Sequence, residues 1–321
     1  MTLFDTVRTY VERKRSFGLL YEKSEQNLWA FAKQTSDIPL GCVTPHQVSS
    51  FLNGSRTSTV TWRAKFNLLK HFFEYWAARG MLQTLPMPRI RPACPQTFAP
   101  YIYSRTEVQV LLRGTRLSQR KDACTIDPAT LRTLLLFLYA TGALAGEVLR
   151  LSREDVDLKN DWVTLRSNRF GRVRRIPIGP DLHQGLRRYV ASVSENNRET
   201  FFANKDGSAI KAVTLGKSFQ RLRTISGVAR HDGASYQPRM HDLRHTFAVH
   251  RLTAWFKEGA DLNRMLPALS AYLGQVGLRS TERYLSMTPE RFRKQLVKLS
   301  PQRRQKRWRD DPALMTFLAG L

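Results

Sequence analysis

Apolar side chains recur with helical spacing through most of the first 80 residues, so each predicted helix has one apolar face. One such face runs from Phe4 to Val11, and Gly18 lies where that helix should end. The longest periodic run extends from Trp62 to Trp76, and Gly80 follows it. The pattern predicts a small bundle of helices in the N-terminal part of the chain.

A proline-rich stretch then interrupts the helical pattern. Five prolines lie between residues 86 and 100, and proline both blocks a helix and stiffens an extended chain. This stretch predicts a linker. Beyond it, Ser104 to Glu107 form a capping-box pattern that indicates the start of a helix. A very apolar helix is expected from Leu131 to Tyr139, ahead of Gly142.

Three short segments separated by turn residues read as strands: 156–158, 162–165 and 173–178. They predict a small antiparallel sheet. Helical periodicity resumes over 182–193, 215–225, 241–255 and 261–273, and a last helix is expected after Pro289. The predicted fold is mainly α: a helical N-terminal bundle and a larger, mostly helical domain with a small antiparallel β-sheet.

The charge of the chain changes the functional picture most. Its 321 residues carry 52 Lys and Arg against 26 Asp and Glu, a formal net charge of +26. Such self-repulsion adds nothing to fold stability, but it attracts a polyanion, because each cation placed on a phosphate releases a condensed counterion. Nucleic acid is therefore the expected partner. A basic membrane-surface protein would concentrate its charge in one amphipathic helix, whereas the arginines here are spread along the sequence.

Length and cysteine content narrow the class further. A chain of this length favours two domains, and its 42% of hydrophobic residues excludes a disordered chain. The three cysteines match neither a disulfide framework nor a zinc cage: Cys42, Cys94 and Cys124. The sequence contains no secretion signal pattern and no apolar run long enough for a membrane span. We expect a cytoplasmic protein that is neither exported nor membrane-spanning.

The first candidate for chemistry is a helical segment rich in histidine and arginine. His241, Arg244 and His245 have the spacing that puts them on one helix face. A guanidinium offers bidentate donors and an imidazole can donate or exchange a proton, so this face suits a phosphate. The two histidines could instead bind zinc, as in the HExxH motif. Asp242 rather than Glu follows His241, and no persuasive third ligand follows, which disfavours zinc.

A second motif lies beyond this segment: Leu273-Gly274-Gln275, then Thr281 and Tyr284. Upstream, residues 141–147 read TGALAGE, a TGxxxxE pattern. With the hairpin and the HxLRH segment between them, these motifs make the chain resemble the tyrosine recombinase family, which includes phage integrases, Xer-type recombinases and tyrosine transposases. The resemblance covers nearly the whole chain. Each motif alone is weak, but all of them in this order and spacing are specific.

The resemblance implies a domain organisation. It assigns residues 1–83 to a helical, SAM-like core-binding domain that binds DNA and 84–102 to a basic linker. It assigns 103–300 to the catalytic domain and 301–321 to a basic tail with an apolar C-terminal helix.

The resemblance also implies a chemistry that needs neither a metal ion nor a cofactor. Tyr284 would attack a DNA phosphodiester and form a 3′-phosphotyrosyl link with a free 5′-hydroxyl, which divides one hard step into two reversible transfers. Arg244 would offset the negative charge of the transition state. His241 would donate a hydrogen bond or transfer a proton.

Three positions depart from the family pattern. Leu144 stands where the family has its first arginine, Arg169 where it has the hairpin lysine, and Gln275 where it has a second histidine. Leu144 is the most serious departure, because losing one preorganised charge contact can cost about 10²–10³ in rate. Three explanations are open. Another arginine fills the gap, with Arg150 and the hairpin arginines as candidates; or the protein is a weakened subunit beside active partners; or the leucine is an introduced substitution.

Basic residues outside this set are candidate contacts to double-stranded DNA. They lie in the hairpin, the N-terminal bundle and the linker: Arg166, Arg172, Arg174, Arg175, Arg63, Lys65, Lys70, Arg89 and Arg91. Contacts of this kind position a protein on the backbone without reading bases. The resemblance implies that the apolar segment 312–319 docks on a neighbouring subunit of a homotetramer, and docking on its own domain is the alternative. A hetero-oligomer with related recombinases is also open.

Two functions follow from these observations. The first is a site-specific recombinase or integrase that cuts and rejoins DNA. The second is a catalytically impaired DNA-binding component that relies on active partner subunits.

Overall fold

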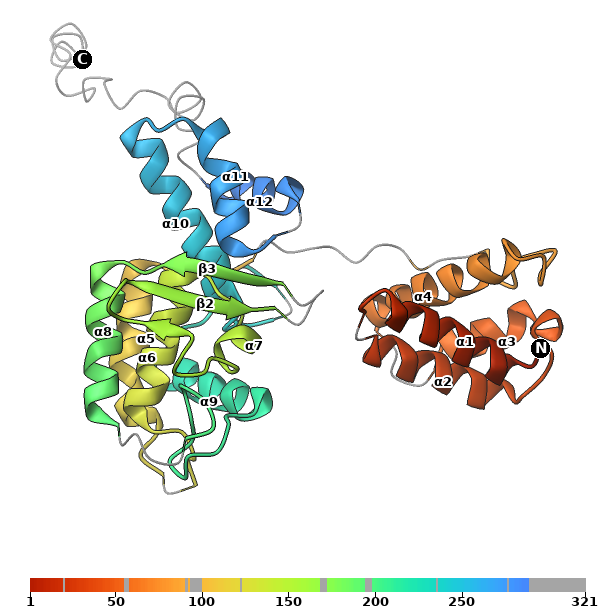
Figure 1. The fold of residues 1–321 in the computed structure, drawn as a ribbon, viewed down its shortest axis with the longest axis horizontal. Coiled ribbons are helices and arrows are strands. Elements are labelled where there is room, and N and C mark those ends of the chain that lie inside the picture. Colours follow the sequence, from red (N-terminus) through yellow and green to blue (C-terminus); the bar gives the residue numbers. More distant parts are fainter. Residues whose placement is uncertain are drawn as a thin grey trace, which may run out of the picture. The chain divides into compact units, whose positions relative to one another are not determined.

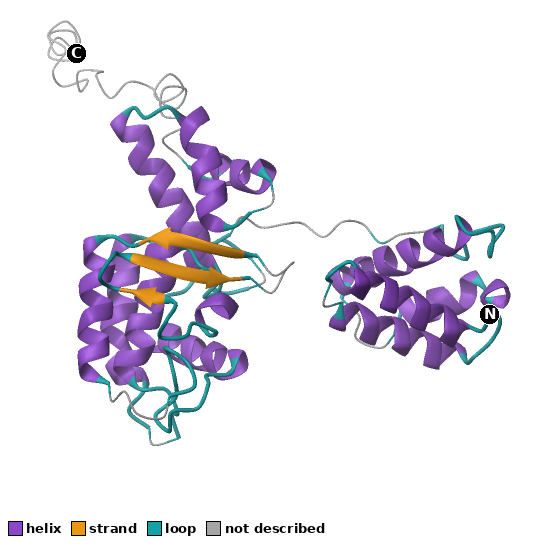
Figure 2. Cartoon of the chain, in the orientation of Figure 1, coloured by secondary structure: helices purple, strands orange, loops and turns teal. Residues whose placement is uncertain are grey.

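The computed structural model describes residues 1–19, 21–54, 58–89, 92, 100–121, 123–167, 172–193, 198–234, 236–275 and 277–288. Within these residues helices dominate and one small sheet is present (Figure 2). The chain divides into two compact units, with α1–α4 in the first and all later elements in the second (Figure 1). The predicted fold class, mainly α with a small antiparallel sheet, is confirmed. Within the described ranges, every helix is too short or too polar to span a lipid bilayer.

The first unit is a helical bundle, as predicted. Its elements are α1 (Leu3–Ser16), α2 (Glu22–Thr35), the 3₁₀ helix η1 (Leu40–Cys42), α3 (Pro45–Leu52) and α4 (Thr59–Ala77). The start of α3 follows from its sequence, because the Thr44 side chain accepts a backbone N–H of the first turn and Pro45 takes the first helical position. Aromatic rings fill the interior, where Phe31 contacts Phe51 and Phe73 edge to face.

The second unit combines a three-stranded antiparallel sheet with helices (Figure 1). The helices are α5 (Arg105–Ser118), α6 (Pro128–Thr141), α7 (Ala145–Val148), α8 (Pro180–Ser192), α9 (Ala212–Ile225), α10 (Asp242–Glu258), α11 (Leu262–Leu273) and α12 (Leu278–Ser286). The strands pair in the order β1 (Val156–Asp157), β2 (Trp162–Arg166), β3 (Val173–Pro177). Val163 stands opposite Ile176, and both are buried in the core. This fixes the register, because a one-residue slip would turn apolar side chains to solvent.

The end of α6 brings the turn over residues 142–147 against α10. Gly142 ends α6 in the left-handed conformation, with φ +62°. A Cβ at this position would lie only 2.6 Å from Cδ1 of Phe247 on α10. The close approach of α10 to this turn therefore requires glycine.

The helices α10, α11 and α12 lie together (Figure 1), and their side chains form a separate apolar cluster. Its members include Phe247, Leu252, Leu269, Leu273 and Tyr284. The helices predicted over 241–255 and 261–273 correspond to α10 and α11. α12 is absent from the predicted helices, and the helix predicted after Pro289 lies outside the described residues. The cluster places Tyr284 close to the first turn of α10.

Candidate active site

Arg244 lies at the centre of the candidate site, on the first turn of α10. The residue is almost fully buried, with 7% of its surface exposed. Nη1 donates to the carbonyl oxygen of Gly142 at 2.8 Å, and Nη2 donates to that of Leu273 at 2.7 Å. The guanidinium therefore joins the C-terminal ends of α6 and α11, where exposed carbonyls favour a cation. Because carbonyls carry no net charge, these bonds leave the Arg244 charge uncompensated.

Tyr284 lies beside this guanidinium, on α12. Its side chain is buried, and its hydroxyl accepts a hydrogen bond from Nε2 of Gln275 at 3.3 Å. The Arg244 guanidinium lies near this hydroxyl and interacts with it electrostatically. Gln275 is oriented in turn by Thr281, whose hydroxyl donates to Oε1 of Gln275 at 2.5 Å. One neutral N–H donor thus binds the phenolic oxygen, and one cation lies beside it.

Burial and the neighbouring groups act in opposite directions on the pKa of Arg244. Burial lowers the pKa of Arg244 from its ordinary value, while the nearby Tyr284 and Glu147 raise it. The guanidinium nevertheless remains a cation, because arginine loses its proton only far above neutral pH. The site therefore presents a buried positive charge next to the phenol.

The two histidines extend the site along α10. The ring centroids of His241 and His245 lie 5.0 Å apart, and the His245 ring lies 5.6 Å from that of Tyr284. Burial first, and the neighbouring His241 second, lower the pKa of His245 to about 4, so this imidazole is neutral at pH 7. Burial and the Arg244 charge also lower the pKa of His241. Within the described residues no third His, Cys, Asp or Glu completes a metal-binding group here, so the zinc alternative lacks a ligand set there.

Glu147 and Arg174 form a buried ion pair near Arg244. Nη1 and Nη2 of Arg174 donate to the two oxygens of Glu147 at 2.7 and 2.9 Å, and Nε donates to the carbonyl of Tyr272 at 3.0 Å. Glu147 also accepts the backbone N–H of Leu144 at 2.9 Å. Burial by itself raises the pKa of Glu147, but the hydrogen bonds from Arg174 and Leu144 outweigh it and the pKa is lowered. Leu144 thus holds its turn through its backbone, while its side chain is 37% exposed and brings no charge.

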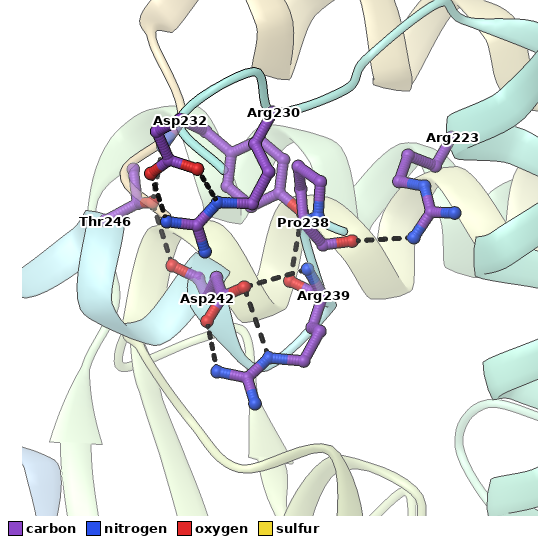
Figure 3. A network of polar contacts seen from close by, with 8 residues as sticks. Arg223, Arg230, Asp232, Pro238, Arg239, Asp242 and Thr246 are labelled. Carbon is purple, nitrogen blue, oxygen red and sulfur yellow. Dashed lines mark hydrogen bonds and ion pairs between the residues drawn. The ribbon is translucent and has the colours of Figure 1, made fainter. Parts of the chain in front are cut away.

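A polar network fixes the loop that enters α10 (Figure 3). Asp242 is fully buried, and its carboxylate accepts the backbone N–H of Arg239 at 2.8 Å and Nη2 of the same residue at 3.0 Å. The Thr246 hydroxyl donates to the Asp242 carbonyl at 2.8 Å. These bonds set where α10 begins, and with it the positions of His241 and Arg244.

Comparison with known proteins identifies the family. The family model described as Phage integrase family matches residues 112–291. The chain belongs to the phage integrase family. The integrase/recombinase-like protein y4rB of Sinorhizobium fredii is 28% identical over 317 residues, which cover 96% of this chain and 99% of that protein. The tyrosine recombinase XerC of Staphylococcus saprophyticus is 23% identical over 299 residues, which cover 92% of this chain and 91% of that protein.

Solved structures of other proteins have the same fold as this member of the phage integrase family. A lambda integrase tetramer bound to a Holliday junction matches with a TM-score of 0.63 at 17% identity, over 88% of this chain and 77% of that chain. At this identity the likeness bears on the fold alone. The resemblance that the motifs predicted is confirmed at the level of the family.

The structure brings part of the predicted catalytic set together. Three predicted residues interact around one hydroxyl group: Tyr284, Arg244 and Gln275. His241 lies one helical turn from Arg244, and Arg169 lies outside the described residues. Sequence reasoning missed the contribution of Thr281, although a residue three positions before Tyr284 on a helix shares its face. Its hydroxyl orients the Gln275 amide.

The hairpin arginines predicted to contact DNA differ in their surroundings. Arg166 and Arg175 lie 2.7 and 4.0 Å from aspartates, and more than half of each side chain is exposed. Arg172 is exposed. Arg174 is different, because its ion pair leaves the side chain only 14% exposed. The Arg174 guanidinium is thus held by a buried carboxylate, and its contact with DNA stays a prediction, as it does for the other hairpin arginines.

The three predicted DNA contacts in the helical bundle also have partners within the protein. These are a carbonyl for Arg63 at 3.0 Å, the face of an aromatic ring for Lys65 at 4.3 Å and a carboxylate for Lys70 at 3.3 Å. Arg89 is exposed, and Arg91 lies outside the described residues. The bundle therefore keeps basic groups at its surface, while the partner atoms hold each of the three in place.

Proposed function

We propose that this chain is a site-specific DNA recombinase that cuts and rejoins double-stranded DNA through a covalent intermediate on Tyr284. The observation that carries the proposal is the position of the Tyr284 hydroxyl, which binds the Gln275 amide and lies near the buried Arg244 guanidinium. A phenol held beside an uncompensated cation is arranged to attack a phosphate that binds the same cation. The net charge of +26 supports a polyanionic substrate.

The proposed transfer balances without an added reactant. The phenolic oxygen of Tyr284 bonds to phosphorus while the bond from phosphorus to the 5′-oxygen breaks; the phenol loses a proton and the 5′-oxygen gains one. A 5′-hydroxyl from the same or another strand then attacks the phosphotyrosyl link and rejoins the DNA. Arg244 donates to the phosphate oxygens as negative charge builds there. His241, at the start of the same helix, supplies a hydrogen bond or a proton.

Leu144 supports a second candidate function. Its side chain is apolar and 37% exposed beside the site, so this position stabilises no negative charge. A site with too few cations would bind DNA and cleave it slowly. Under this alternative the chain is a DNA-binding component that works beside active partner subunits.

Covalent trapping separates the two functions. Purified protein is mixed with labelled duplexes of random sequence, each nicked so that a short fragment with its 5′-hydroxyl diffuses away after cleavage. The proposal predicts a protein–DNA product that withstands denaturation, also forms with the matched control Tyr272→Phe, and is absent with Tyr284→Phe. Product that forms only after Leu144→Arg supports the second function. Product that persists in Tyr284→Phe refutes both.

We further propose the domain boundaries and the assembly. The compact unit that contains α1–α4 supports a DNA-binding domain over residues 1–83, followed by a linker over 84–102, a catalytic domain over 103–300 and a tail over 301–321. The tetrameric state of the lambda integrase structure supports an oligomer on DNA. Assembly with itself or with related recombinases is distinguished by whether the pure chain alone forms tetramers on the trapped duplex.

A further inference from the structure

The described part of the site contains two buried guanidiniums, but only one of them has an uncompensated charge. Arg174 is neutralised by the two oxygens of Glu147, whereas Arg244 binds two uncharged carbonyl oxygens. A phosphodiester under attack gains negative charge on several oxygens, and it is stabilised best by fixed cations on more than one side. The turn over residues 142–147 presents Leu144 at this place and adds no cation.

Arg150 follows this turn and differs from the arginines of the neighbouring sheet. Each of the described strand arginines Arg166, Arg174 and Arg175 has a carboxylate within 4.0 Å. The hydrogen bond that the structure gives the Arg150 side chain goes to an uncharged oxygen instead, because Nη2 donates to the carbonyl of Arg166 at 3.3 Å. The Arg150 charge therefore remains available to an anion.

The Arg150 side chain folds back over the turn. Nη1 lies 3.5 Å from the place that a Cβ would take on Gly146, so a longer side chain at that position would compete for the same space. Nη2 reaches the last residue of β2, at the end of the β2–β3 pair. The guanidinium thus lies between the turn that contains Leu144 and this hairpin. Both Gly146 and Arg150 are exposed, so a DNA backbone can approach them.

We propose that Arg150 is a catalytic residue that supplies a second guanidinium to the scissile phosphate. It would take the place of the cation that Leu144 does not provide. The inference rests on the proposed function. Arg244 binds the phosphate from α10, and Arg150 binds it from the turn that follows α7. Arginine suits this position because its paired N–H groups match two phosphate oxygens, and it needs no proton transfer to do so.

The test compares Arg150→Ala, the double variant Arg150→Ala with Leu144→Arg, and the control Arg187→Ala, which removes an exposed arginine from α8. The probe is a nicked duplex recovered from the random pool as covalent product of the unaltered protein. Arg150→Ala should slow formation of covalent product by about 10²–10³-fold. Its affinity for the intact duplex should fall no more than that of Arg187→Ala. Adding Leu144→Arg should restore most of the lost rate.

Two results overturn the inference. One is an Arg150→Ala rate equal to that of Arg187→Ala, and the other is a double variant as slow as Arg150→Ala alone. Because Arg150 is exposed, its variant should melt at the temperature of the unaltered protein, and a large drop in melting temperature would instead assign the residue a role in folding. Unaltered protein that gives no covalent product contradicts the proposed function itself. Product with an unaffected Arg150→Ala rate contradicts only the inference about Arg150.

Discussion

Replacing Glu147 by Gln should lower the free energy of unfolding of the second unit by about 3 kcal/mol at neutral pH, since a buried charge then loses its partner. The Glu147 side chain is 3% exposed and that of Arg174 is 14% exposed. The variant keeps the shape of the side chain but turns one acceptor oxygen into a donor that faces the guanidinium. Removing one partner of a buried pair costs about 3–5 kcal/mol. We take the lower end because Arg174 keeps its bond to the Tyr272 carbonyl.

The same pair makes a pH-dependent contribution to stability. The pKa of Glu147 is lowered from its ordinary value of 4.5 in the folded state. The ion pair therefore contributes its full stabilisation above pH 4.5, the pKa of Glu147 in the unfolded chain. This stabilisation is lost as the pH falls through the lower pKa that Glu147 has in the folded protein. The difference in stability between the unaltered protein and Glu147→Gln should stay constant from pH 7 to about 5 and shrink below it.

Thermal unfolding followed by circular dichroism tests both statements. For a unit of this size, the expected loss corresponds to a melting temperature lower by about 6–12 °C. Glu74→Gln is the matched control, because Glu74 pairs with Lys70 at the surface, where both side chains are about 40% exposed. That change should leave the melting temperature nearly unchanged, because water screens an exposed pair. Equal melting temperatures for the two variants at pH 7 would show that the buried pair does not stabilise the site.

Three further changes test other parts of the site. Gly274→Ala should cost about 1–3 kcal/mol in thermal melting, because φ is +68° and a Cβ would lie 2.8 Å from a guanidinium nitrogen; Gly216→Ala on α9, with open space around it, should be neutral or stabilising. Thr281→Val removes the donor that orients Gln275 and should slow covalent product formation by about tenfold, as one lost hydrogen bond implies. Because burial lowers the pKa of His245 to about 4, the NMR signals of its imidazole should not shift between pH 5.5 and 8. A titration midpoint near pH 6.5 would contradict the burial of this ring.

Helix ends and strands that are determined by residues close together in the sequence were predictable. Ser104 and Glu107 form both bonds of the expected capping box at the start of α5, and Gly142 ends α6. The strands expected over 162–165 and 173–178 correspond to β2 and β3. The helix α12 was not predictable in this way, because so short a helix is stabilised by tertiary packing rather than by its own sequence.

The partners of the charged side chains were not predictable, because they lie far apart in the sequence. From the sequence, the hairpin arginines were predicted to form one DNA-binding surface. Neighbouring residues of a strand, however, point to opposite faces. Arg174 therefore turns inward to Glu147, which is 27 positions away, while Arg175 stays exposed. Arg244 reaches carbonyls 102 and 29 positions away. A histidine–arginine motif predicts the residues of a phosphate site, but not the backbone atoms that hold them.

The contacts that hold Arg244 and Tyr284 do not use the Leu144 side chain. The turn that contains Leu144 is fixed by its backbone N–H to Glu147, and Tyr284 is oriented through Gln275. An uncharged residue at 144 is therefore compatible with the same scaffold. It follows that an active recombinase and an impaired DNA-binding component of this sequence would share one fold and one position of the tyrosine. They would differ in the rate of the chemical step, so the effect of restoring a cation at position 144 is the measurement that separates them.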